Sequence, residues 1–180
     1  MYHINKKRVE ELGKKKGAKC DRGFKDAELK HYFDMTVSNI IEFYSTKSSF
    51  DISQFINHID HYFNDDKTNP VYKNYKVGEI VFVDFGATNF GYEISYPHPA
   101  IVLAQSEAFA LLAPCSTKKY GHGFRDIFDG IEADGFYSDT GIILDNVRWA
   151  SKGRIISSIG QTNEEFVKKV IDKIIELMKE

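Results

Sequence analysis

His98 and Ser116 are the side chains in this sequence that best fit acid–base chemistry at a shared site. An imidazole can accept or donate a proton near neutral pH, and a hydroxyl can donate a hydrogen bond to developing negative charge. Further polar side chains follow Ser116 and could neutralise a phosphate: Lys118, Lys119, His122 and Arg125. By type, these residues supply what metal-independent RNA cleavage requires: a base for the ribose 2′-hydroxyl, an acid for the leaving 5′-oxygen, and cations for the transition state.

Each of the two central residues also has a structural interpretation. His98 stands between two prolines and could be a loop histidine without a partner. The Ser116 hydroxyl could cap the turn that follows a strand. Lys118 and Lys119 could be a pair of solvated lysines.

Cofactor chemistry finds little support in the sequence. It contains no Gly-x-x-x-x-Gly-Lys phosphate loop, no Cys-x-x-Cys pair and no His-Glu-x-x-His motif, and we expect no cofactor. His58 and His61 have a spacing that could hold a metal, but no third ligand is in register, so we interpret them as a solvated helix face. Cys115 ends an apolar segment beside Pro114, which favours a buried structural thiol over a nucleophile.

Short apolar segments must position these groups. Residues 79–85 are β-branched and aromatic and lie between two glycines, which predicts a strand, and 100–104 and 108–113 predict two more. If the second and third strands form an antiparallel hairpin around residues 105–107, His98 and Ser116 come to the same edge of the sheet. Further short strands are expected at 141–144 and 154–156, and residues 117–137 are expected to form a long loop with room for one irregular strand.

Helices are predicted on either side of these strands. Apolar residues recur at helical spacing from Asp26 to Tyr44, and a second helix opens at Asp51 with Gln54 as its capping-box partner. We expect these two helices to pack as a hairpin whose wide apolar faces need a further partner. Thr162 and Glu165 form a capping box that opens a terminal helix. The fold class is therefore α+β: a small SH3-like β-barrel with a C-terminal helix, preceded by an N-terminal helical extension.

The first twenty residues form a basic segment with a net charge of +5. One interpretation is an arm that binds nucleic acid; the other, which we favour because no aromatic residue is interleaved among the lysines, is a solvated and partly helical tail. A polar, Pro70-containing linker follows the helices. We therefore place a basic arm and helical hairpin at residues 1–69 and the barrel domain at 70–180.

Composition sets outer bounds on function. The 180 residues are 42% hydrophobic and 28% charged, with a net charge of −2, which indicates a globular protein without bulk attraction to nucleic acid. The two cysteines, Cys20 and Cys115, are expected to be free thiols in a reducing compartment. No apolar segment approaches the length of a membrane span, and the N-terminus does not resemble a signal peptide, so we expect a cytoplasmic protein without membrane association.

The order of several segments resembles the MazF/PemK family of toxin endoribonucleases. The resemblance is carried by Gly-Glu-Ile-Val-Phe-Val-Asp-Phe from Gly78, by Gly91-Tyr92-Glu93, by Pro-His-Pro-Ala-Ile-Val-Leu from Pro97 and by Ala-Pro-Cys-Ser ending at Ser116. A second signature resembles residues 143–148 and 151–156. The resemblance covers roughly residues 76–180 and nothing before them.

The resemblance implies roles for individual residues. In the family an Arg precedes the proline that opens the second strand, and a Thr or Ser follows the third strand; the matching positions are His98 and Ser116. Because His replaces Arg, either cleavage uses an imidazole or the site has lost activity.

The family's RNA-binding positions correspond to Tyr92, Glu93, Asp145 and Asn146. Arg148 matches a family arginine, and it either contacts phosphate or forms a structural salt bridge. Phe90 and Tyr92 could stack on bases or pack over the barrel. Ile94 replaces a family Gln, which predicts a different base preference. The strand end through Lys119 also resembles ToxN-type RNases, which use Ser and Lys.

The implied function is a sequence-selective, metal-independent endoribonuclease that cleaves single-stranded mRNA as the toxin of a toxin–antitoxin system. The implied partners are single-stranded RNA, a cognate antitoxin and a second copy of the chain. Two alternatives stay open: a CcdB-like gyrase inhibitor and an inactive RNA-binding barrel. The N-terminal helices have no counterpart in short family members, and we expect them to enlarge the dimer or occupy the surface an antitoxin would cover.

Overall fold

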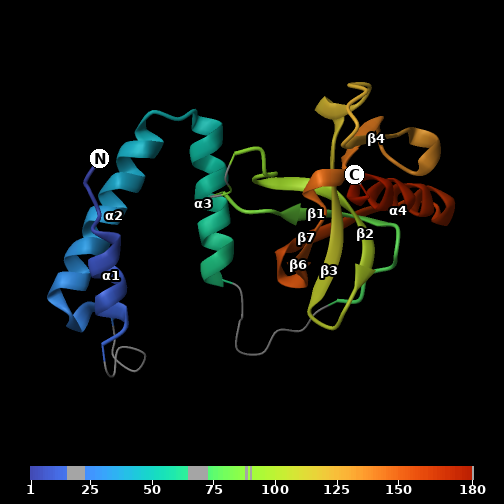
Figure 1. The fold of residues 1–180 in the computed structure, drawn as a ribbon. Helices are drawn as coiled ribbons and strands as arrows, with labels where there is room; N and C mark the ends of the chain where they lie inside the picture. The colour runs from blue at the N-terminus through green and yellow to red at the C-terminus, as the bar shows by residue number, and fades with distance from the viewer. Residues whose placement is uncertain (16–22, 65–72, 88, 90, 180) are drawn as a thin grey trace. The chain divides into compact units, whose positions relative to one another are not determined.

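The computed structural model describes residues 1–15, 23–64, 73–87, 89 and 91–179 (Figure 1). They form two compact units, Met1–Ser53 and Gln54–Glu180. The division falls inside a helix and lies earlier than the boundary at 69/70 expected from the polar linker. Side chains from the second half of that helix contact the strands, which explains the earlier boundary.

The first unit contains α1 (Lys6–Gly13) and α2 (Ala27–Ser45). Asp26 caps α2 by accepting from the backbone N–H of Glu28 and Leu29. Arg8 and Lys15 of the basic segment pair with acids: Arg8 lies 2.7 Å from Glu28, and Lys15 lies 2.8 Å from Asp26. This pairing supports the partly helical, structural interpretation of the segment; Lys16, Lys19 and Cys20 lie outside the described residues.

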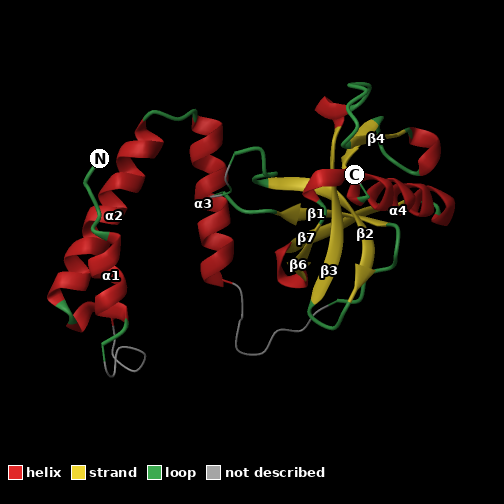
Figure 2. Cartoon of the chain, in the orientation of Figure 1, coloured by secondary structure: helices red, strands yellow, loops and turns green. Residues whose placement is uncertain are grey.

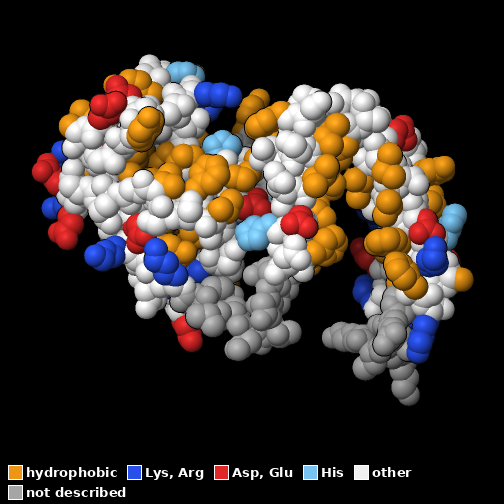
Figure 3. Space-filling view, turned by 180° about the vertical axis from the view of Figure 1, so that it is seen from behind, with side chains coloured by type: hydrophobic (Ala, Val, Ile, Leu, Met, Phe, Trp, Pro, Cys, Tyr) orange, Lys and Arg blue, Asp and Glu red, His pale blue; other side chains and the backbone are white. Residues whose placement is uncertain are grey.

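The apolar face of α2 is left uncovered within its unit. None of its residues is buried, and Figure 3 shows apolar side chains at the surface of the helices. The most exposed on α2 include Phe33, Ile41 and Phe43. This agrees with the expectation that the helical face needs a further partner. Whether α2 and the next helix form a hairpin stays a prediction.

That next helix, α3, spans Ser49–Asn64. It begins two residues earlier than expected, and its capping residue is Ser48 instead of Asp51. The Ser48 hydroxyl accepts from the backbone N–H of Asp51 at 3.1 Å and donates to the Asp51 carboxylate at 2.7 Å. None of the described helices is both long and apolar enough to cross a bilayer.

The described strands form one antiparallel sheet (Figure 2). Hydrogen bonding gives the order β4-β5-β3-β2-β1-β7, with β6 also pairing to β3. Their bounds are β1 (Glu79–Asp84), β2 (Pro97–Gln105), β3 (Phe109–Ser116), β4 (Ile127–Gly130), β5 (Thr140–Ile143), β6 (Arg148–Ser151) and β7 (Ile155–Gln161). The irregular strand expected in residues 117–137 is therefore β4. The sequence did not separate β6, because its four residues, Arg-Trp-Ala-Ser, alternate too briefly to show a strand pattern.

Both faces of the central strands are buried. On one face, Val81, Val102 and Leu112 belong to the cluster that fills the curved sheet. On the other, Ile101 and Cys115 pack with residues of α4 (Glu164–Met178), which covers that face. Burial on both sides explains why these strands appear in the sequence as continuous apolar runs instead of alternating patterns. The α+β fold with a terminal helix is confirmed.

The terminal helix starts differently from the predicted capping box. Asn163, not Thr162, is its N-cap, and the Asn163 side chain accepts from the backbone N–H of Phe166 at 2.7 Å. Thr162 is 2% exposed, and its hydroxyl has no hydrogen-bond partner among the described residues.

Candidate active site

The β2–β3 hairpin brings His98 and Ser116 together. Its register pairs Ala100 with Pro114 and Ile101 with Ala113. If the same register continued by two residues along both strands, it would place His98 opposite Ser116 at one end of the hairpin.

The two residues line one cavity of about 540 Å³. Further predicted residues line it as well: Tyr92, Lys119, Asp145 and Asn146. Ile94, for which the resemblance implied a role in base preference, also lines the cavity. The rest of the lining comes from residues that sequence reasoning missed: Ser95, Phe124, Asp126, Ile127 and Ile143. Most of these missed residues lie in the β1–β2 loop or in and beside β4 and β5, where the sequence shows no motif that marks them.

The His98 ring favours its neutral form. Burial lowers the pKa of His98, an effect that hydrogen bonding to the backbone of Tyr96 and Ser95 opposes and the charge of Lys118 assists. Its Nδ1 lies 3.4 Å from the carbonyl oxygen of Tyr96. An N–H at Nδ1 would leave Nε2 with a lone pair that can accept a proton.

The backbone beside His98 is unusual. Tyr96 has a φ of 66°, in the left-handed region that non-glycine residues rarely adopt. Its backbone is fixed by two hydrogen bonds, from Tyr96 N to Gly86 O at 2.7 Å and from Phe85 N to Tyr96 O at 3.2 Å. Conformations of this kind are often found where a protein positions functional groups.

The Ser116 hydroxyl does not cap the turn that follows β3. Ser116 is the N-cap residue of the short 3₁₀ turn Thr117–Lys119, but its side chain makes no capping hydrogen bond. The alternative interpretation of Ser116 as a structural cap is therefore wrong. Its strand partner is Gly141, and a Cβ at Gly141 would lie 2.8 Å from the backbone of Lys119. A glycine there allows the turn that carries Lys119 to lie against β5.

The β1–β2 loop is tied to the wall of the cavity. The backbone N–H of Ile94 donates to Asn146 Oδ1 at 2.7 Å, and Arg148 Nη2 donates to the carbonyl of Ile94 at 3.1 Å. The Arg148 guanidinium lies 5.2 Å from the centre of the Phe85 ring, and its Nε is buried without a partner among the described residues. Arg148 thus holds the loop by its contacts with protein and does not line the cavity.

Several predicted site residues lie outside the cavity lining. Glu93, Lys118, His122 and Arg125 are exposed and are not part of the wall. Lys118 still acts on His98 through its charge. Phe90 lies outside the described residues. Cys115 is a buried free thiol, and burial raises its pKa to about 12, which agrees with a structural role.

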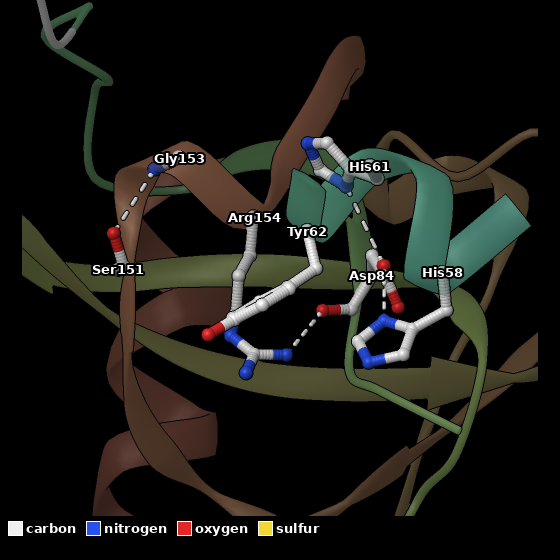
Figure 4. A pocket seen from close by; sticks show the side chains of 7 residues that line it. All are labelled: His58, His61, Tyr62, Asp84, Ser151, Gly153 and Arg154. Atoms are coloured by element: carbon white, nitrogen blue, oxygen red, sulfur yellow. Dashed lines mark hydrogen bonds and ion pairs between the residues drawn. The ribbon is translucent and has the colours of Figure 1, made fainter. Parts of the chain in front are cut away.

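The sequence pattern predicted that His58 and His61 form a solvated helix face, and this prediction is wrong. The Nδ1 atoms of His58 and His61 lie 2.7 Å and 3.4 Å from Asp84 Oδ2, and the His58 side chain is only 14% exposed (Figure 4). Burial raises the pKa of Asp84, but hydrogen bonds from His58 and Gly86 outweigh it and the net pKa is lowered. Among the described residues no group of three or more His, Cys, Asp or Glu side chains could hold a metal ion. The contact of the two histidines with Asp84 was not predicted, because Asp84 is far from the helix in sequence.

A family model of the PemK-like, MazF-like toxins of type II toxin–antitoxin systems matches residues 76–178. The chain belongs to this toxin family. The family match spans every described strand and all of α4, and it leaves α1, α2 and α3 outside. The toxin MazF-mt6 of Mycobacterium tuberculosis is a similar solved structure, with 12% identity, a TM-score of 0.44 and coverage of 56% of this chain and 96% of its own. The comparison with curated proteins finds no match.

Proposed function

We propose that this PemK-like protein is a sequence-selective, metal-independent endoribonuclease that cleaves single-stranded mRNA. The observation that supports the proposal is that His98 and Ser116 line the same cavity. Family membership supports a toxin of a toxin–antitoxin system. The replacement of the family Arg by His98 then changes how the proton is moved and does not abolish the chemistry.

Neutral His98 is suited to act as the general base. Its Nε2 takes the proton of the ribose 2′-hydroxyl, and the 2′-oxygen attacks the adjacent phosphorus. The bond from phosphorus to the 5′-oxygen breaks, which leaves a 2′,3′-cyclic phosphate. The leaving 5′-oxygen takes a proton from water and becomes a 5′-hydroxyl, and the His98 imidazolium returns its proton to water. The Ser116 hydroxyl donates to a non-bridging oxygen, and the Lys119 ammonium offsets the charge that develops there.

Other residues of the cavity can recognise bases. Tyr92 is fully exposed, so its ring is open to stacking with an unpaired base. Asp145 and Asn146 present acceptors and donors for base edges, and they are ordered by a hydrogen bond of 2.8 Å between their side chains. Single-stranded RNA fits these groups better than a duplex does, because its bases can be splayed out.

The test is incubation of purified protein with a long RNA in the presence of EDTA. We expect cleavage that leaves 2′,3′-cyclic phosphate ends, and a loss of about 10²-fold or more in His98→Ala and Ser116→Ala. Lys168→Gln, an exposed change on α4 away from the cavity, is the matched control and should cleave as the parent does. Parent-like cleavage by His98→Ala would reject the role of His98.

Two outcomes would favour the alternatives. RNA retained without cleavage would indicate an inactive RNA-binding barrel. Inhibition of gyrase without any effect on RNA would indicate a CcdB-like inhibitor. We further propose a homodimer, a cognate antitoxin as partner and a cytoplasmic location, all of which follow from the toxin role.

A further inference from the structure

A second cavity lies where α3 meets the strands, away from the residues assigned to cleavage. Its volume is about 160 Å³, and its lining consists of His58, His61, Tyr62, Asp84, Ser151, Gly153 and Arg154 (Figure 4). The first three come from α3, which lies outside the family match. This cavity therefore depends on a helix that the family model does not include.

The only carboxylate in the lining is already engaged. Asp84 is 3% exposed; its Oδ2 contacts both histidine rings, and its Oδ1 accepts from the backbone N–H of Gly86 at 2.9 Å. With both oxygens occupied and little exposed surface, Asp84 presents few acceptor sites to the cavity. Its charge orients the histidines by holding their Nδ1 atoms.

The Arg154 guanidinium has donors to spare. Its Nη1 donates to the backbone carbonyl of Asp84 at 3.1 Å, and among the described residues it has no carboxylate within ion-pair distance. Arg154 is exposed at the mouth of the cavity. It ends a stretch, residues 148–154, that contains Arg148 and Lys152 and no acidic residue. A guanidinium with unused N–H groups is the side chain best suited to bind a phosphate.

The two histidines line the same cavity from α3. Figure 4 shows the second ring nitrogen of each histidine directed away from Asp84. A ring whose Nδ1–H is held by a carboxylate presents an Nε2–H when it is protonated. The cavity has a volume of about 160 Å³, which is enough for one tetrahedral oxyanion.

We propose that this cavity binds a phosphate group, with Arg154 as the main cation and His58 and His61 as additional donors. The phosphate is either a backbone phosphate of the RNA, outside the bond that is cleaved, or a free phosphate. The interpretation of the ligand as a phosphate of the RNA backbone rests on the proposed function. Arg148, which lies in the same basic stretch as Arg154, donates to the carbonyl of Ile94 in the wall of the first cavity.

The first experiment uses inorganic phosphate as the probe and does not depend on cleavage. The full chain is titrated with phosphate at pH 6, where histidine side chains commonly carry charge, and binding is followed by calorimetry. We expect saturable binding that weakens at least tenfold in Arg154→Gln and is unchanged in Lys168→Gln, which removes the same charge elsewhere. His61→Gln should weaken binding to a smaller extent. Thermal unfolding of each variant shows whether it is folded. The proposal is overturned if the parent shows no saturable binding. It is also overturned if Arg154→Gln and His61→Gln are folded and both bind phosphate as tightly as the parent does.

The second experiment identifies the source of the phosphate. In a His98→Ala background, RNA affinity is measured against salt concentration. Loss of one phosphate contact should reduce the slope of log affinity against log salt by about 0.7 for a single strand. A reduced slope in Arg154→Gln assigns the cavity to the RNA backbone. An unchanged slope, with phosphate binding still dependent on Arg154, assigns it to free phosphate, and this result stands even if the protein does not cleave RNA.

Discussion

At the scale of single residues, the site departs from what the family resemblance implies at Ile94 and at His98, and the second departure bears on the proposed chemistry. His98 stands where the family resemblance places an Arg, and an imidazole can move a proton whereas a guanidinium stays charged. The surroundings of His98 favour the neutral ring, because it is partly buried and lies near the Lys118 ammonium. The exchange is therefore compatible with a base mechanism and makes activity dependent on pH.

The pH dependence of cleavage tests this assignment. Because the pKa of His98 is lowered, the ring stays neutral, and the base stays competent, as pH falls through the ordinary histidine range. We expect the acidic limb of kcat/KM to be centred below pH 6.5, because an ordinary histidine has a pKa of about 6.5. In His98→Arg this acidic limb should vanish. An acidic limb centred above pH 6.5 in the parent would contradict the proposed role.

Thr162 offers a test of an unpaired buried group. Its hydroxyl is buried without a hydrogen-bond partner among the described residues, although water solvates it in the unfolded chain. Replacing Thr162 by Val keeps the shape and removes the unpaired oxygen, so we expect the free energy of unfolding to rise by about 1 kcal/mol. Urea unfolding measures the change. Thr162→Ser, which keeps the hydroxyl and loses the methyl group, should instead be less stable than the parent.

At the scale of elements, the β2–β3 hairpin is the feature that creates the candidate site. It brings two residues that are eighteen positions apart in the chain, His98 and Ser116, to the same cavity. The β1–β2 loop forms the adjacent wall, and Asn89 ties it together by donating to the carbonyls of Phe85 and Ile94. α4 covers the outer face of the sheet, and its Phe166 packs against Phe128 and Phe136.

The start of α4 provides a test at this scale. Asn163 accepts from the backbone N–H of Phe166, and the next turn carries the residues that cover the sheet. Asn163→Ala should lower the free energy of unfolding by about 1 kcal/mol, because a backbone donor loses its partner. Asn163→Ser keeps an acceptor and should be close to the parent. Equal stability of all three proteins in urea would show that this cap contributes nothing.

At the scale of the molecule, the barrel carries its own core. All buried residues of both apolar clusters lie at or beyond Tyr75, whereas α2 buries none of its own. The N-terminal helices therefore expose apolar surface without adding to this core. Such a surface is typical of a protein that associates with a partner.

Removal of residues 1–68 tests what the helices do. We expect the shortened chain to fold and unfold cooperatively, because both clusters stay complete. We also expect the full chain to have twice its monomer mass of 20.6 kDa in solution, and the shortened chain to form a weaker dimer. Light scattering after size-exclusion chromatography gives both masses. An unchanged dimer after the deletion would show that the helices do not enlarge the interface.

Local sequence patterns were sufficient for much of the fold. The helices at residues 26–44 and 51–63, the first three strands and the terminal helix all followed from apolar spacing and from turn residues. The same patterns placed His98 and Ser116 at one edge, because an antiparallel hairpin has few registers that bury its apolar residues. Family membership of residues 76–178 was likewise carried by residues in sequence order.

Tertiary structure alone decided the rest. Ser95, Phe124 and Asp126 became part of the cavity wall because the β1–β2 loop and the segments around β4 and β5 meet there, over separations in the chain that no local pattern encodes. His58 and Asp84 met for the same reason, 26 positions apart. The sequence determined which chemical groups the chain carries and which short segments carry them. The packing of distant segments determined which of those groups share a cavity.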